Sequence, residues 1–268
     1  MEFWQALVLG MLQGVTEFLP ISSTAHLLIF TQVMGWQELG DKTFVNAIQL
    51  GSVFAVIWYF WPDLGQLGRG GWAAWQGRDW QREEWKILVG IAVGTLPALG
   101  VGFLFRNVLP KSAVVIAIAS ILLSMLLAAA EVWGKRKRNF GNLTIQDGLL
   151  VGLGQMLALI PGVSRSGATL TTALFLGLER DAAARFSFLL GIPTLAIATG
   201  YESYKVFQDL DTFAPLIVGI ISSFIFSYLA IAWLLGFLRH QNTWIFVWYR
   251  LAFGGAILGA ITAGQLIS

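Results

Sequence analysis

Long apolar runs separated by short polar stretches constrain the fold of this chain more than any other feature. A helix needs about 20 apolar residues to cross a bilayer core of about 30 Å. Six runs approach or reach that length, over residues 44–61, 86–105, 112–133, 183–200, 214–237 and 244–267. Only 12% of the residues are charged, about half the share typical of soluble domains. We therefore predict an all-α polytopic integral membrane protein with six full transmembrane helices.

The rare residue types exclude several kinds of chemistry. The chain has no cysteine, which excludes disulfides, thiolate metal ligands and a cysteine nucleophile. It has only two histidines, a composition that does not favour a zinc site. The net charge of +2 gives no indication of a nucleic-acid partner, so we expect none. The first segment lacks a basic n-region and a cleavage site, and we expect it to be retained.

Two other apolar regions are interrupted. The first, over about residues 2–36, breaks at Pro20, and the second, over about residues 145–178, breaks at Pro161 and Gly162. Proline and glycine stop helices. The second arm of each region has about 13 residues and spans only about 20 Å, less than a bilayer core. We predict two re-entrant helical hairpins.

The two hairpins resemble each other in sequence. An offset of 142 residues pairs several unusual positions: Leu7 with Leu149, Gln13 with Gln155, and Ser22 with Ser164. Three predicted spans, an odd number, separate the hairpins, so the second copy is inverted relative to the first. We predict a single membrane domain built from a first repeat, residues 1–134, and a second, inverted repeat, residues 135–268.

The basic residues predict the orientation in the membrane. If the loop at residues 135–138 faces the cytoplasm, eleven of the seventeen lysines and arginines lie on that side and four on the other. This distribution agrees with the positive-inside rule. Both termini then lie outside, and the two hairpins enter from opposite faces. Their tips could meet inside the membrane, where transporters with inverted repeats place their substrate sites.

Two charged side chains mark the hairpin tips. Glu17 is the only acid well inside an apolar segment, and Arg165 is its basic counterpart. Such groups are costly in a membrane and usually face a cavity or a partner. One interpretation is an ion pair that only locks the hairpins together. The other is a functional site, in which Gln13 shares a helix face with Glu17, four residues away.

Further polar residues follow the first break. Ser22, Ser23 and Thr24 stand where the second half-helix should begin. Any one of these hydroxyls could simply be the N-cap. His26 lies three residues after Ser23, roughly on the same side, and it could be structural or catalytic. The nearness of His26 to Ser23 and Glu17 favours a catalytic role.

The second tip predicts a phosphate-binding site. Ser164 and Ser166 supply hydroxyls, and the start of the following half-helix presents free N–H groups to an anion. Arg165 adds a fork of donors that matches phosphate oxygens. A phosphate ester handled inside a membrane suggests a lipid substrate. The first tip would then supply the reactive and metal-binding half of the site.

These motifs closely resemble those of the undecaprenyl pyrophosphate phosphatase family, also called the bacitracin-resistance protein family. That family carries a Glu/Gln-x-x-x-Glu motif, here "QGVTE" at residues 13–17, which continues into "FLPISSTAH". Its second motif, "PGVSRSGAT", stands at residues 161–169. The likeness extends over most of the chain. One departure is Gln13 in place of a glutamate, which weakens the charge of any metal site.

The resemblance implies an enzyme that hydrolyses undecaprenyl pyrophosphate to undecaprenyl phosphate and inorganic phosphate. This reaction recycles the carrier lipid for peptidoglycan synthesis and confers bacitracin resistance. The resemblance also implies the bacterial cytoplasmic (inner) membrane, with the active site open to the outer face. The expected partners are the polyprenyl pyrophosphate substrate and membrane lipids, and a homodimer is possible.

The resemblance also implies roles for individual residues. Arg165 clamps the pyrophosphate. Glu17 binds a divalent cation, Mg²⁺ or Ca²⁺, or acts as a base, with Gln13 assisting. The attacking group is Ser23, His26 or a metal-polarised water. The hydroxyls expected to help bind the phosphates are those of Ser22, Thr24, Ser164, Ser166 and Thr169.

Two other functional classes compete with this interpretation. A transporter or flippase for a lipid phosphate or an ion would also use an inverted repeat with broken helices. A purely structural scaffold would explain the hydrophobicity but not the polar tips. Phosphate release by purified protein in detergent separates the enzyme from the carrier, because it needs no transport.

Overall fold

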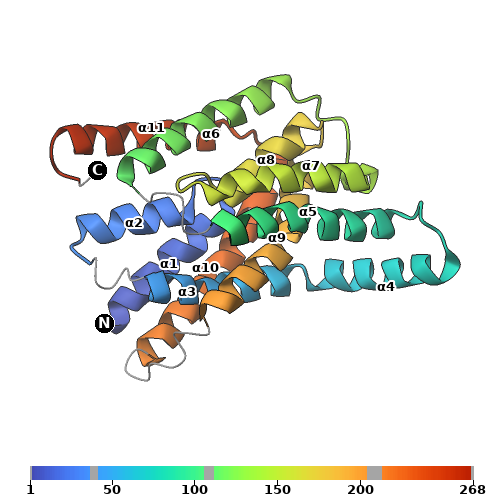
Figure 1. Cartoon of the computed structure of the whole chain (residues 1–268), viewed down its shortest axis with the longest axis horizontal. Helices are drawn as coiled ribbons and strands as arrows, with labels where there is room; N and C mark the ends of the chain where they lie inside the picture. The colour runs from blue at the N-terminus through green and yellow to red at the C-terminus, as the bar shows by residue number, and fades with distance from the viewer. Residues whose placement is uncertain (1, 37–41, 106–111, 204–212, 267–268) are drawn as a thin grey trace.

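A computed structural model describes residues 2–36, 42–105, 112–203 and 213–266, and these residues are helical with no β-strand among them (Figure 1). The described ranges omit short stretches of both predicted repeats, including the last residue of the expected span 244–267. The elements are α1 (Phe3–Phe18), α2 (Ser23–Val33), α3 (Lys42–Tyr59), α4 (Trp61–Gly77), α5 (Glu83–Phe105), α6 (Ala113–Trp133), η1 (Phe140–Asn142), α7 (Ile145–Met156), η2 (Leu157–Leu159), α8 (Arg165–Phe175), α9 (Arg180–Ser203), α10 (Phe213–His240) and α11 (Trp244–Thr262).

Five helices, α5, α6, α9, α10 and α11, are long and apolar enough to cross a membrane. Each lies on one of the predicted spans. The sixth predicted span, 44–61, corresponds to α3, which bends by 61° into α4 after a short break. If that bent pair counts as one span, the described residues contain six. The chain is a multi-pass helical membrane protein.

Both predicted hairpin regions form pairs of short helices joined by an irregular turn. α1 ends at Phe18, and Leu19 takes up an extended backbone ahead of Pro20. In the second region the turn uses Gly162 at φ +91°, a left-handed conformation that favours glycine. A Cβ there would also lie 2.6 Å from the carbonyl oxygen of Ile116. Both turns lie in the interior of the molecule (Figure 1).

Glycines bring each hairpin close to a long helix. α1 packs along α10, and α7 packs along α5. A Cβ on Gly10 would lie 2.3 Å from the carbonyl oxygen of Gly219, and a Cβ on Gly152 would lie 2.1 Å from that of Gly94. These contacts are too close for any side chain, so the small residues let the backbones meet, as in other membrane helix pairs.

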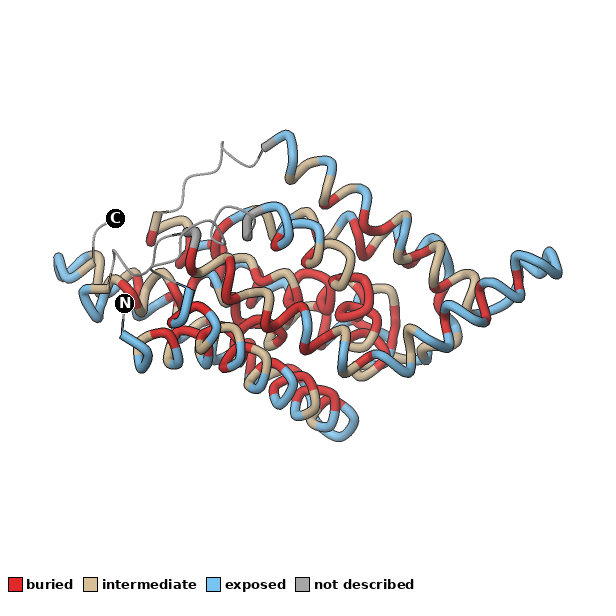
Figure 2. The backbone as a smooth tube through the Cα atoms, turned by 90° about the horizontal axis from the view of Figure 1, so that it is seen from below, coloured by how far each residue is buried: buried red, intermediate tan, exposed pale blue. Residues whose placement is uncertain are grey.

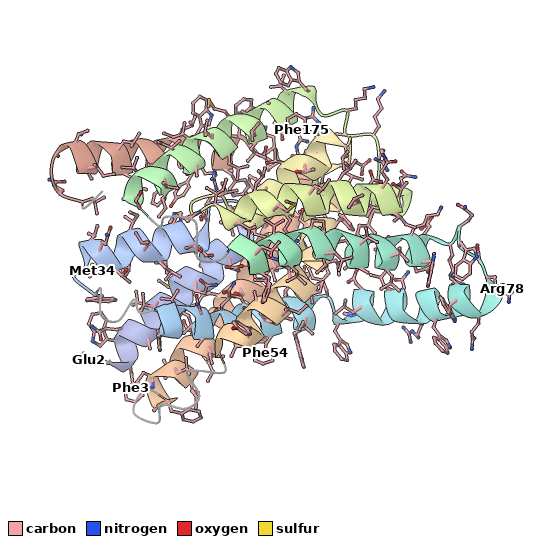
Figure 3. All side chains as sticks on the ribbon, viewed as in Figure 1. Glu2, Phe3, Met34, Phe54, Arg78 and Phe175 are labelled. Carbon is pink, nitrogen blue, oxygen red and sulfur yellow. The ribbon has the colours of Figure 1, made fainter. Side chains whose placement is uncertain are left out.

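The distribution of buried and exposed residues agrees with a protein that lies in a membrane. Buried residues gather in the centre of the bundle, and the outward faces are exposed (Figure 2). Many exposed side chains are large and apolar, such as Phe54 at 55% and Trp133 at 74%, which suits contact with lipid. Glu2 before α1 and Arg78 at the α4–α5 turn lie at opposite ends of the molecule (Figure 3).

Candidate active site

The two hairpin tips meet through a pair of opposite charges. Glu17 stands in the last turn of α1, and Arg165 is the first residue of α8. Arg165 Nη2 donates to Glu17 Oε1 at 3.3 Å, and both side chains are largely buried. The tip-to-tip contact expected from the sequence is therefore present. A buried ion pair is weak evidence of a stabilising role, because the cost of desolvation offsets the attraction. The contact alone therefore does not show what the pair does.

The carboxylate of Glu17 is surrounded by donors. Its Oε2 accepts from Ser23 Oγ at 2.6 Å and from Gln13 Nε2 at 3.0 Å. Its Oε1 accepts from Arg165 and, at 3.5 Å, from Gln49 Nε2 of α3. Gln13 is buried and does not line the cavity described below. Its observed contact therefore orients the carboxylate.

The turn after Pro20 is strained at Ser22. Ser22 has φ +76° and ψ +98°, a backbone region that side chains rarely adopt. It is the N-cap residue of α2 but makes no side-chain cap hydrogen bond. The strain is one residue before Ser23, whose hydroxyl contacts Glu17. Strain of this kind tends to occur where a turn positions a functional group.

His26 contacts this strained turn through the backbone of Ser22. Its Nδ1 lies 2.8 Å from the carbonyl oxygen of Ser22. A carbonyl only accepts, so Nδ1 carries the proton, and the neutral ring accepts from Tyr249 O–H at Nε2, 2.6 Å away. The ring also stacks on Phe253 with centroids 4.2 Å apart. Both nitrogens are therefore engaged, and His26 is not among the residues that line the cavity.

A glycine in α9, Gly191, leaves space for the guanidinium of Arg165. A Cβ built on Gly191 of α9 would lie 1.8 Å from Arg165 Nη1. Arg165 Nε is buried and makes no hydrogen bond to the described residues. One donor of the guanidinium is therefore unpartnered among the described residues, and Arg165 lines the cavity described below.

The hydroxyls of the second tip divide into two groups. Ser164 lines the cavity, and its Oγ accepts from the backbone N–H of Gly167 at 3.1 Å as an N-cap. Ser166 and Thr169 are buried and do not line it. Ser166 Oγ donates to the carbonyl of Leu19 at 3.0 Å, and Thr169 Oγ1 donates to that of Arg165 at 2.9 Å. Ser166 therefore joins the two tips, whereas the hydrogen bond of Thr169 stays within α8. The expectation that these two hydroxyls bind phosphate is not supported.

Arg250 of α11 ties the tips together, and sequence reasoning missed this role. Its side chain is completely buried. Nη1 donates to the carbonyl of Pro20, Nη2 to that of Gly162, each at 3.0 Å, and Nε to that of Ser120 at 3.3 Å. One arginine therefore binds both helix breaks. The sequence feature that could have revealed this role is the position of Arg250 inside a predicted apolar span.

A cavity of about 200 Å³ lies between the tips and the long helices. The first tip contributes Glu17 and the three hydroxyls predicted from the sequence, while Ser164, Arg165 and Val163 come from the second. The polar lining residues that sequence reasoning did not assign are Gln49, Gln155 and Thr194. Each is a polar residue within a predicted membrane segment, which was the available signal.

The donor set limits the kind of metal that could bind. Among the described residues that line the cavity, Glu17 is the one carboxylate, and no cluster of three or more acids and histidines in the described chain could hold a metal ion. Mg²⁺ is often held by one or two carboxylates together with substrate phosphates. The site therefore fits a cation that arrives with a phosphate group and does not fit a metal centre made of protein ligands alone.

The fold and the site define a class: a polytopic helical membrane protein with a polar cavity, lined by an acid and an arginine, between two broken helical regions. A profile of the family described as bacitracin resistance protein BacA matches residues 6–256. Because this match covers most of the sequence, the chain belongs to that family.

Similar curated proteins cover nearly the whole chain. An undecaprenyl-diphosphatase of Thermosynechococcus vestitus is 55% identical over 98% of this chain and 97% of its own length. One of Trichormus variabilis is 53% identical over 99% of this chain and 86% of its own. One of Synechococcus elongatus is 49% identical, with 99% and 96% covered. These relatives are named for a hydrolase, so they give the transporter alternative no support.

Proposed function

We propose that this protein is an undecaprenyl-diphosphatase, which hydrolyses undecaprenyl pyrophosphate to undecaprenyl phosphate and inorganic phosphate. The observation that carries the proposal is one cavity in which a serine hydroxyl and an arginine both contact the same carboxylate. The names of the relatives support the same reaction. Recycling of the carrier lipid and bacitracin resistance follow from it.

The size of the cavity suits the pyrophosphate headgroup of the substrate. At about 200 Å³ it is smaller than the roughly 300–1,000 Å³ of a pocket for a drug-sized ligand. Apolar residues such as Ala98, Leu159 and Ala198 form part of its wall. The pyrophosphate occupies the polar end of the cavity, and the polyprenyl chain extends along these residues into the lipid.

Arg165 is the main contact of the pyrophosphate. In the absence of substrate its Nη2 binds Glu17 Oε1. On binding, the guanidinium exchanges this carboxylate for phosphate oxygens, and its free Nε donates as well. Ser164 and Thr24, which line the cavity, help to orient the phosphates. The exchange also releases Glu17 for chemistry.

Ser23 is the attacking group and Glu17 its base, because Ser23 Oγ already donates to Glu17 Oε2 at 2.6 Å. The Oγ–P bond forms at the terminal phosphorus as the proton passes to Glu17. The bond from that phosphorus to the bridging oxygen breaks, and the monophosphate lipid leaves with the electron pair and takes the proton from Glu17. Glu17 then deprotonates a water that hydrolyses the phosphoserine, and Ser23 recovers its proton.

His26 positions the attacking group, and direct attack by His26 is less favoured. Its Nδ1–H is committed to the carbonyl of Ser22, and its Nε2 to Tyr249. The ring thereby fixes the strained residue next to Ser23. A water nucleophile is the remaining alternative, and the experiment below distinguishes all three.

Glu17 would hold the divalent cation that the family resemblance implies, together with the substrate phosphates. Gln13 keeps the carboxylate oriented. When bound, the cation neutralises charge on the phosphates. Either Mg²⁺ or Ca²⁺ suits oxygen ligands of this kind.

The arrangement of the helices supports an inverted repeat of residues 1–134 and 135–268. α1 packs along α10 and α7 along α5, while α3 meets α9 and α6 meets α11. These contacts are the ones that a two-fold axis in the membrane plane would generate. The hairpins then enter from opposite faces, and the distribution of basic residues favours the cytoplasmic side for the loop at residues 135–138. The cytoplasmic (inner) membrane, with the site open to the outer face, is what the family resemblance implies.

Trapping the reaction tests this mechanism. Purified protein in detergent is mixed with radiolabelled undecaprenyl pyrophosphate and quenched during turnover. We expect acid-stable phosphate on Ser23, none in Ser23→Ala, and phosphate release with wild-type protein. Acid-labile phosphate on His26 would exclude serine attack, and turnover with no phosphoenzyme would favour water. Absence of release from wild-type protein at every cation concentration would overturn the enzyme proposal.

A further inference from the structure

Gln155 of α7 lines the active-site cavity and carries a buried oxygen without a hydrogen-bond partner among the described residues. Its side chain is 2% exposed, and its Oε1 makes no hydrogen bond to the described residues. Its Nε2 donates to Thr194 Oγ1 at 3.2 Å, so Oε1 is the end of the amide without a partner. Both residues line the cavity. A buried acceptor without a partner is costly, so a ligand is the natural partner for this oxygen.

The equivalent residue of the first hairpin makes a different contact. At the offset of 142, Gln155 corresponds to Gln13, whose amide donates to Glu17. The residue that corresponds to Glu17 is Leu159. Gln155 thus occupies the same place on its half-helix but has no carboxylate to orient. Its amide is available for a different task.

The chemistry of the free atom restricts its ligand. A carbonyl oxygen accepts hydrogen bonds, so it cannot bind the oxygens of an ionised phosphate. It can ligate a hard divalent cation, for which glutamine and carboxylate oxygens are ordinary ligands. Glu17, the one carboxylate among the described lining residues, borders the same cavity.

We propose that Gln155 Oε1 is a ligand of the divalent cation that enters with the pyrophosphate, so that the cation is held by both hairpins. The inference rests on the proposed function and extends its metal site beyond the Gln13–Glu17 motif. Glu17 supplies the charge and Gln155 a neutral oxygen. Phosphate oxygens and water complete the shell.

Direct cation binding tests the inference without turnover. Mn²⁺ is titrated into purified protein in detergent with methylene diphosphonate as a non-hydrolysable pyrophosphate, and free Mn²⁺ is measured by electron paramagnetic resonance. We expect Gln155→Leu to weaken Mn²⁺ binding at least about tenfold, since even outer-shell changes cost 10–100-fold. The matched control is Gln32→Leu, because Gln32 also has a buried unpartnered Oε1 but does not line the cavity. It should bind Mn²⁺ like the wild type.

A second variant tests which end of the amide faces the ligand. Gln155→Glu keeps an oxygen at the site and adds a charge, so it should tighten Mn²⁺ binding. If Nε2 faced a phosphate instead, the same change would repel the diphosphonate and weaken binding, which overturns the inference. Should Gln155→Leu fail to fold, Thr194→Val releases the amide and should weaken Mn²⁺ binding by a smaller factor.

The remaining outcomes separate this inference from the proposed function. Equal Mn²⁺ affinity in Gln155→Leu and wild type overturns the inference, even if phosphate release falls. Wild-type protein that releases phosphate but binds no Mn²⁺ also overturns it, while the proposed function stands. Wild-type protein that binds Mn²⁺ through Gln155 but never releases phosphate overturns the proposed function alone.

Discussion

The two hairpins share a backbone plan but carry opposite chemistry. Each consists of two short helices whose tip lies inside the bundle. In the first, Gln13 orients Glu17, and Ser22 adopts a strained left-handed backbone. In the second, Leu159 stands at the position of Glu17, and Ser164 at that of Ser22 is an ordinary N-cap with φ −67°. The acid and the strain belong to one tip, and the arginine belongs to the other.

This difference shows how two hairpins with similar backbones form one asymmetric site. The second tip has regular helix-start geometry and presents donors, which suits a bound anion. The first tip is distorted next to Ser23, the residue that we assign as the attacking group. Arg250 contacts both breaks through backbone carbonyls, so it fixes the tips regardless of which side chains they carry.

The largest expected effect comes from removing the charge of the second tip. Arg165→Ala should lower kcat/KM for phosphate release by at least about 10³-fold, because a single lost donor to developing charge already costs 10²–10³-fold. Thermal unfolding in detergent should show that the variant remains folded. Activity within tenfold of the wild type would mean that the second tip does not bind the phosphates.

A smaller loss of activity is expected when a side chain is added at Gly191, beside the guanidinium of Arg165. Gly191→Ala should reduce phosphate release by about ten- to a hundredfold, because its Cβ would displace the guanidinium and misplacement by about 1 Å can cost 10²-fold. The control is Gly200→Ala on the same helix, where an added Cβ meets no atom within 4 Å. Equal activity of the two variants would contradict the described position of Arg165.

The supporting role of His26 predicts a partial loss. His26→Ala removes the donor to the strained carbonyl of Ser22, and we expect kcat to fall about tenfold, less than the 10²–10⁴-fold typical of a group that itself transfers the proton. Tyr249→Phe, which removes only the partner of Nε2, should have a weaker effect. Phosphate should still be trapped on Ser23 in both variants. Complete loss of phosphoenzyme in His26→Ala would favour direct attack by the histidine.

The smallest effects should distinguish the backbones of the two tips. Ser164→Ala removes an N-cap hydrogen bond and should cost about 1 kcal/mol of stability. Ser22→Gly relieves a left-handed conformation at a residue that makes no cap bond and should stabilise by a few tenths to about 1 kcal/mol. Unfolding temperatures in one detergent measure both changes. Destabilisation by Ser22→Gly would show that the strain is compensated elsewhere.

Hydropathy and helix breakers predicted most of the fold. The described ends of α5, α6, α9 and α10 fall within three residues of the predicted spans, because bilayer thickness fixes the length of an apolar helix. The breaks followed from Pro20, Pro161 and Gly162. The helix α4 and its bend from α3 were not predicted, since the expected span ends at residue 61 and only Pro62 marks the start of a new helix.

The site was predicted in part. Glu17, Ser23 and Arg165 meet as expected because each is a costly polar group beside a helix break. Gln49, Gln155 and Gly191 could not be assigned, because their roles depend on packing between helices far apart in sequence. The separation of His26 from the cavity depends on Tyr249 and Phe253 in α11, and helical spacing within α2 carries no information about that contact.

Cross-linking across the tips tests the central claim most directly, and the absence of native cysteine leaves no background. Thr24 and Val163 line the same cavity from different hairpins, and neither is buried. In Thr24→Cys/Val163→Cys, a short bifunctional thiol reagent should join the two cysteines within one chain, as seen by mass spectrometry, and methylene diphosphonate should slow the reaction. Two cysteines that each react with a monofunctional reagent but never become joined would show that the tips do not share a pocket.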